Sequence, residues 1–134
     1  MSAQRLARMT CAAALVGALI GAKGTAAGAQ DGASAERGDA VFQHSCAPCH
    51  ARGPGDDGRA MLPGTAALQI KYQGAVPPAL EDRADLPADV LAVFLRQGSF
   101  SMPPFRKTEL SDADIADIAA YLAETAARGA PASE

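Results

Sequence analysis

The chain of 134 residues contains no tryptophan, and aromatic residues make up 4% of it. It also has only three cysteines and two histidines, so a structural zinc site, which needs four such ligands, has few candidates. We find no convincing β-strand pattern, which argues against a thioredoxin-like fold around a cysteine pair. A domain of this size buries only about two-thirds of its unfolded surface. The core is therefore expected to be small and poor in large rings.

Basic residues are also scarce outside the N-terminus. Three of the twelve basic residues (Arg5, Arg8 and Lys23) lie in the first thirty positions, whereas all fifteen acidic residues come later. An acidic domain without a basic run is poorly suited to bind nucleic acid or an anionic membrane surface. We therefore expect no nucleic-acid partner.

Residues 1–29 have the features of a secretory signal peptide. Two arginines precede a short apolar stretch, and Ala27-Gly28-Ala29 is a small-residue cleavage pattern. Glycine and lysine interrupt the apolar stretch, so a membrane-spanning helix is the weaker interpretation. Cys11 lies in this segment, and the residues before it match lipoprotein sites poorly. We predict cleavage, export to the periplasm, no stable membrane insertion afterwards, and one domain over residues 30–134.

The motif Cys46-Ala47-Pro48-Cys49-His50 is the most specific feature of the chain. The spacing C-x-x-C-H is typical of covalent haem attachment, in which each thiol bonds one vinyl group of the porphyrin. His50 is then the expected proximal iron ligand, with its other ring nitrogen donating to a backbone carbonyl. A redox-active cysteine pair and half a zinc site, with His44 as a further ligand, are the alternatives. We predict one haem c attached through Cys46 and Cys49.

A loop rich in glycine and proline, residues 51–64, is predicted after the motif. Pro63 in this loop has a free carbonyl and is the candidate acceptor for the ring N–H of His50. Arg59 is a candidate partner for a haem propionate, and an ordinary solvated charge is the alternative.

Met102 lies in a second irregular segment, residues 99–105, which two prolines stiffen. Methionine and histidine together are a recognised pair of haem iron ligands. We therefore predict that Met102 is the sixth ligand, with Met61 as a competitor and a core methionine as the alternative.

Helical periodicity and end signals predict an all-α chain. Gly38 within the first helix suggests close approach of another helix, unless it is accidental. The predicted helices run from Ala35 to about His44 with Ser34 as cap, from Thr65 as cap to Gln73 with Gly74 as stop, from near Pro87 to Gly98, and from Ser111 to about Arg128.

Taken together, these features resemble the class I c-type cytochromes, over roughly residues 36–122. In that family a glycine, an aromatic residue and the first haem cysteine follow one another at spacings of four, as Gly38, Phe42 and Cys46 do here. Tyr121 fits the aromatic residue of the family's C-terminal helix, and Met102-Pro103 fits its ligand loop. The resemblance implies about four helices around one haem, and one-electron transfer instead of enzyme activity.

The segment from Met102 to Leu122 is similar to cytochromes that serve periplasmic dehydrogenases, such as the cytochrome subunit of p-cresol methylhydroxylase. This resemblance implies a dehydrogenase as electron donor and a cytochrome or oxidase as acceptor. Arg106 and Lys107 are candidates for docking an acidic partner, with ordinary solvated charges as the alternative. The competing function is a five-coordinate haem that acts as a small-ligand sensor or peroxidase, in which Met102 only packs.

Overall fold

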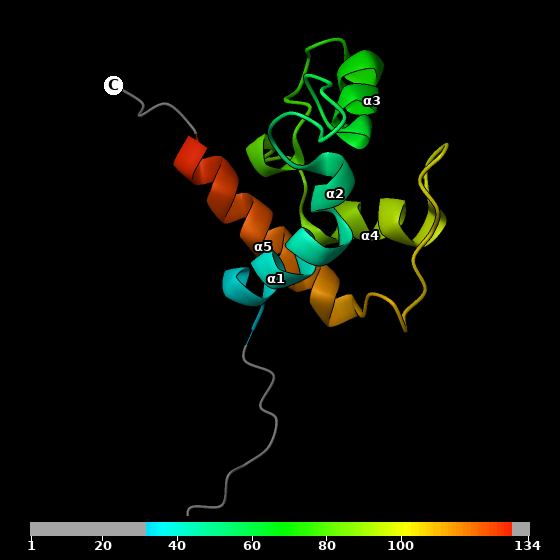
Figure 1. Cartoon of the computed structure of the whole chain (residues 1–134). Helices are drawn as coiled ribbons and strands as arrows, with labels where there is room; N and C mark the ends of the chain where they lie inside the picture. The colour runs from blue at the N-terminus through cyan, green and yellow to red at the C-terminus, as the bar shows by residue number, and fades with distance from the viewer. Residues whose placement is uncertain (1–31, 130–134) are drawn as a thin grey trace, which may run out of the picture.

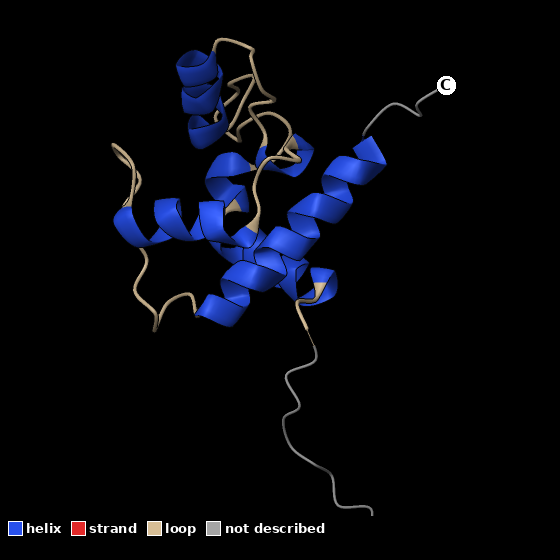
Figure 2. Ribbon diagram, turned by 180° about the vertical axis from the view of Figure 1, so that it is seen from behind, coloured by secondary structure: helices blue, strands red, loops and turns tan. Residues whose placement is uncertain are grey.

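The structure is a computed structural model that describes residues 32–129. The predicted signal peptide, residues 1–29, and the tail after residue 129 lie outside the described residues. Figures 1 and 2 show that helices and loops form the described part of the chain. The elements are α1 (Ala35–Ser45), α2 (Ala47–His50), α3 (Pro63–Tyr72), the 3-10 turn η1 (Leu80–Asp82), α4 (Ala88–Gln97) and α5 (Asp112–Gly129).

The all-α prediction is confirmed, and the four predicted helices correspond to α1, α3, α4 and α5. Sequence periodicity did not predict two elements, the 3-10 turn η1 and α2, a single helical turn formed by the attachment motif itself. Within residues 32–129, no helix has the length and apolar character that crossing a bilayer requires.

Local capping signals begin two of the helices as predicted. Ser34 caps α1, and its hydroxyl accepts a hydrogen bond from the Arg37 N–H at 3.3 Å. At α5, the Asp114 N–H donates to Ser111 Oγ at 3.1 Å, and the Ser111 N–H donates to the Asp114 carboxylate at 2.8 Å. This reciprocal pair is a capping box, with aspartate in the place of the usual glutamate.

The start of α3 differs from the prediction. The helix begins at Pro63, because proline at the first helical position has a suitable φ and its missing N–H removes no helical bond. Thr65 is therefore not the cap: its side chain is buried inside the first turn of the helix. The end agrees to within a residue, since Gln73 and Gly74 both adopt left-handed backbone conformations.

Helices α1 and α5 cross closely near the centre of the molecule (Figure 1). A Cβ atom on Gly38 would overlap the carbonyl oxygen of Asp117 and lie 2.9 Å from the Cβ of Tyr121. Next to this contact, the rings of Phe42 and Tyr121 pack with their centroids 5.1 Å apart. The glycine predicted to allow close helix approach therefore does so against α5.

A single buried cluster joins these helices to α4. Met102 and Phe105, in the segment between α4 and α5, pack partly buried against this cluster. The segment that carries the predicted sixth ligand is therefore anchored to the core, whose buried apolar members include Phe42, Leu91, Leu95, Leu110, Ile115, Ile118 and Leu122.

Candidate functional site

The attachment motif forms one compact turn directly after α1. The N–H groups of Cys49 and His50 both donate to the Cys46 carbonyl, at 3.1 and 2.9 Å. The Cys46 N–H in turn donates to the Phe42 carbonyl at 2.8 Å, which fastens the turn to α1. The two thiols and the imidazole are therefore held within five consecutive residues, namely the four residues of α2 and its N-cap Cys46.

The two thiols of the motif differ in their surroundings. Both cysteines are free, with Cys46 buried and Cys49 exposed. Burial raises the pKa of Cys46 to about 11, and the negative charge of Cys49 adds to this effect, so Cys46 is poorly suited to be the reactive thiolate of a redox pair. The zinc alternative also lacks support, because residues 32–129 contain no group of three or more His, Cys, Asp or Glu that could hold a metal ion.

His50 lies against the backbone at the start of α3. A Cβ on Gly64 would lie 2.6 Å from His50 Cε1 and 2.7 Å from Nδ1, so only glycine leaves room for the ring. Burial lowers the pKa of His50, which favours the neutral imidazole, the form that binds a metal. Its Nδ1 atom is buried without a hydrogen-bond partner, so the predicted bond to the neighbouring Pro63 carbonyl is not made in this structure.

Two polar side chains that the sequence analysis missed hold the chain just after the motif. The hydroxyl of Thr65 donates to the Ala51 carbonyl at 3.0 Å. The buried carboxylate of Glu81 accepts from the Arg52 N–H at 2.8 Å and from the Tyr121 hydroxyl at 3.3 Å. Both contacts fix the backbone next to His50, and neither residue lies in a pattern that would have revealed its role.

Met102 is held by a tight turn at the end of α4. Ser99 and Met102 exchange backbone hydrogen bonds of 3.0 and 2.9 Å. Gly98 has a φ of +73°, and a Cβ there would lie 2.7 Å from the Met102 carbonyl oxygen. A left-handed glycine is therefore required for the turn that carries Met102.

Arg96 braces the segment that follows Met102, and the sequence analysis did not identify this role. Its guanidinium donates to the Phe105 carbonyl at 3.1 Å and to the Leu110 carbonyl at 2.8 Å. The Phe105 N–H also donates to the Leu95 carbonyl at 2.7 Å. The chain after Met102 is thus fixed to the last turn of α4 at two residues, Phe105 and Leu110.

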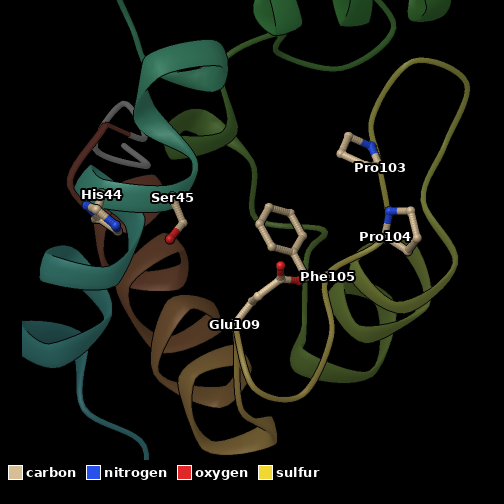
Figure 3. Close-up of a pocket in the computed structure, with 6 residues that line it drawn as sticks. All are labelled: His44, Ser45, Pro103, Pro104, Phe105 and Glu109. Carbon is tan, nitrogen blue, oxygen red and sulfur yellow. The ribbon is translucent and has the colours of Figure 1, made fainter.

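An open cavity of about 540 Å³ lies between the end of α1 and this segment (Figure 3). On one side it is lined by the two residues before Cys46, and on the other by the three residues after Met102. In Figure 3 the Glu109 carboxylate lies beside Phe105, and Ser45 lies on the opposite side of the cavity. The full lining consists of His44, Ser45, Pro103, Pro104, Phe105 and Glu109.

These residues fit a covalently bound haem. Two thiols and a neutral imidazole occupy one turn, and the Nδ1 atom of that imidazole is buried without a hydrogen-bond partner. The cavity volume lies within the range of about 300–1,000 Å³ found for cofactor sites. Arg59, by contrast, pairs with Asp57 at 3.1 Å on an exposed loop, which favours the alternative of a solvated charge.

Comparisons with known proteins agree with this assignment. Residues 33–122 match the protein family described as cytochrome c oxidase, cbb3-type, subunit III. Cytochrome c6 from Picosynechococcus sp. is 36% identical over 109 residues, which cover 81% of this chain and 86% of that protein. The matched family range includes the attachment motif, Pro63 and Met102.

Proposed function

Because this chain belongs to the class I c-type cytochromes, which carry one covalently attached haem c and transfer electrons, we propose that His50 and Met102 are the axial ligands of its iron. The observation that carries the proposal is the placement of the two groups. The neutral His50 imidazole lies on the attachment turn, which directly follows the cavity-lining residues His44 and Ser45. Residues 103–105, directly after Met102, line the other side of that cavity.

The haem supplies reversible one-electron chemistry at its iron. The chain's own contribution is to hold two ligands so that neither iron position needs to open to a substrate. Thr65 and Glu81 fix the backbone beside His50, while Gly98 and Arg96 fix the Met102 segment. Methionine as second ligand raises the reduction potential relative to stronger donors. The Pro63 carbonyl is the proposed acceptor for His50 Nδ1, since Gly64 lies directly against that atom.

A second part of the proposal concerns the cellular location of the protein and its redox partners. We propose that the protein works in the periplasm, accepts electrons from a dehydrogenase and passes them to a cytochrome or an oxidase. The signal-peptide pattern of residues 1–29 supports export. The name of the matched family, which refers to a subunit of an oxidase, supports an oxidase as acceptor.

Arg106 and Lys107 are less suited to docking than the sequence suggested. Arg106 pairs with Glu109 at 2.9 Å, and Lys107 pairs with Asp112 at 2.7 Å. These hydrogen bonds lower the pKa of both carboxyl groups, so the acids stay ionised and compensate the two positive charges. The alternative of ordinary surface charges is therefore favoured.

Optical spectra of the purified protein and of two methionine variants test the axial ligands. The wild-type protein should show a sharp reduced α-band and, when oxidised, a weak near-infrared charge-transfer band. Met102→Ala should lose the near-infrared band and lower the reduction potential, because the thioether ligand is gone. Met61→Ala is the matched control and should retain both properties. If Met102→Ala leaves the spectrum unchanged, Met102 only packs, and the five-coordinate sensor or peroxidase becomes the better assignment.

A further inference from the structure

Lys71, on α3, differs from every other basic residue of the described chain in its ionic partners. Within residues 32–129 it has no carboxylate within ion-pair distance, whereas each of the eight other cations has one, with Asp112 shared by Arg96 and Lys107. Those eight are Arg37, Arg52, Arg59, Arg83, Arg96, Arg106, Lys107 and Arg128. In an acidic chain that compensates its positive charges so thoroughly, one uncompensated lysine requires an explanation.

Aromatic rings surround the Lys71 ammonium. Its Nζ atom lies 5.1 Å from the ring centroid of Tyr72, 5.6 Å from that of Phe94 and 5.8 Å from that of Phe100. These distances are within the range of a cation–π contact. The rings orient the ammonium but carry no net charge. The positive charge of Lys71 is therefore positioned without being neutralised.

The large exposed apolar side chains of the described residues occur on the same three segments. Ile70 is 77% exposed on α3, Val93 is 50% exposed on α4, and Phe100 is 97% exposed in the turn before Met102. Figures 1 and 2 show α3, α4 and the segment after α4 on one side of the molecule, away from the C-terminal end of α5. The Lys71 surface is defined by Ile70, Lys71, Tyr72, Val93, Phe94 and Phe100.

The unpaired charge of Lys71 favours a partner molecule as the occupant of this surface. Phe100 also has a left-handed backbone, with a φ of +53°, which is unfavourable for a phenylalanine. An exposed aromatic residue in an unfavourable conformation, beside exposed aliphatic residues, is typical of an interaction site.

We propose that the Lys71 surface docks an acidic redox protein, whose carboxylates pair with Lys71 while its apolar side chains cover Phe100 and Ile70. The proposal rests on the electron-transfer function proposed above and names the surface that this function uses. Phe100 lies inside the turn closed by Ser99 and Met102, so a partner on this surface contacts the segment that bears the proposed iron ligand. A single uncompensated cation selects a protein carboxylate, whereas a polyanion requires a basic cluster.

Charge reversal at two lysines tests the proposal. Lys71→Glu and Lys107→Glu change the net charge equally, but Lys107 already pairs with Asp112. The probe is the hydroquinone of a flavodoxin, an acidic flavoprotein. Its flavin, an anionic hydroquinone, loses one electron to become the neutral semiquinone, and the ferric haem gains that electron and becomes ferrous. Stopped-flow measurements at low salt should show the second-order rate falling about tenfold in Lys71→Glu and less than twofold in Lys107→Glu.

Salt and the apolar residues give a second comparison. The difference between the two lysine variants should vanish near about 1 M salt, where the screening length is about 3 Å. Phe100→Ser should slow the reaction at every salt concentration, because it removes apolar contact area instead of charge. Equal slowing by both lysine variants, or none by either, would overturn the docking proposal.

The reduction potential separates docking from a role at the haem. Docking predicts that Lys71→Glu leaves the potential of the isolated protein within error of Lys107→Glu. A shift confined to Lys71→Glu would assign Lys71 to a haem propionate and overturn the docking proposal. Failure of the proposed function looks different, since the wild-type protein would then lack the near-infrared band before any partner is added.

Discussion

The α1–α5 crossing and the Lys71 surface differ in how their charged groups are paired. At the crossing, the side chain of Asp117 is only 6% exposed and accepts hydrogen bonds from the Ser34 N–H at 2.6 Å and from the Arg37 guanidinium at 2.8 and 2.9 Å. On the other side, Phe100 is 97% exposed, and Lys71 has no carboxylate partner among the described residues.

This difference distinguishes the helix crossing, which is structural, from the side of the molecule that is proposed to bind other molecules. The crossing is completed by protein atoms alone and holds α1, which carries the attachment turn. The side built from α2, α3, α4 and the Met102 segment contains groups whose expected partners belong to other molecules. Examples are the charge of Lys71, which has no carboxylate partner among the described residues, and the exposed ring of Phe100. The groups that the chain leaves unpaired therefore indicate where it acts.

The largest expected effect is a side chain introduced at the crossing. Gly38→Val should lower the free energy of unfolding by at least about 3 kcal/mol, because the new atoms overlap the backbone of Asp117 and α1 must move away from α5. Denaturant unfolding followed by circular dichroism measures this. Gly32→Val is the control, since a Cβ there has no atom within 4 Å. Equal stability of the two variants would contradict the close crossing.

The same truncation on each side compares the two regions directly. Ile118→Ala removes a side chain that is 2% exposed, and it should lower the free energy of unfolding by about 2–4 kcal/mol. Ile70→Ala removes one that is 77% exposed and should change it by less than about 0.5 kcal/mol. Both are measured by denaturant unfolding of the haem-loaded protein. A large loss in Ile70→Ala would mean that the Lys71 surface is part of the core.

A smaller effect is expected where α3 supports the attachment turn. Thr65→Val keeps the shape of the side chain but removes the hydroxyl that donates to the Ala51 carbonyl. The free energy of unfolding should fall by about 1–2 kcal/mol, because a buried carbonyl loses its partner. The exposed Thr108→Val is the matched control and should be nearly neutral. If both variants have equal stability, the Thr65 hydrogen bond does not support the turn.

The smallest expected effect is the pH dependence of the crossing. The hydrogen bond from Arg37 is the main cause that lowers the pKa of Asp117 below its ordinary value of 3.8. A lowered pKa means that this contribution is fully present above pH 3.8 and is lost as the pH falls through the folded-state value. Asp117→Asn should lower stability at pH 7 by about 1 kcal/mol and flatten the loss of stability below about pH 4.

Acid unfolding monitored by circular dichroism measures this dependence. Arg37→Gln should produce a similar flattening, because Asp117 then loses the donor that lowers its pKa. If both variants keep the wild-type slope, other carboxyl groups control the acid sensitivity.

Local sequence signals predicted most of the helices and the attachment motif at the centre of the site. Ser34 and Ser111 begin their helices as expected, and Gly38 allows the predicted helix contact. The C-x-x-C-H motif forms one turn, as its spacing indicated. Thr65 was assigned wrongly, because a threonine before an apolar run is a typical cap signal, whereas Pro63 begins the helix two residues earlier. The structure places Gly64, the residue after Pro63, against His50, and His50 Nδ1 has no hydrogen-bond partner, so the roles of Pro63 and Met102 stay predictions.

The sequence by itself determined the four longer helices, most of their ends and the attachment motif, because these depend on groups within about four residues of each other. Only the tertiary structure decided that Thr65 and Glu81 support the motif, that Arg96 braces the Met102 segment, and that Lys71 is the one Lys or Arg of residues 32–129 without an ion pair. These contacts join residues 14, 29 and 40 positions apart, as in the bonds of Thr65 to Ala51, Arg52 to Glu81 and Tyr121 to Glu81. Such partners share no periodicity in the chain, so folding alone brings them together.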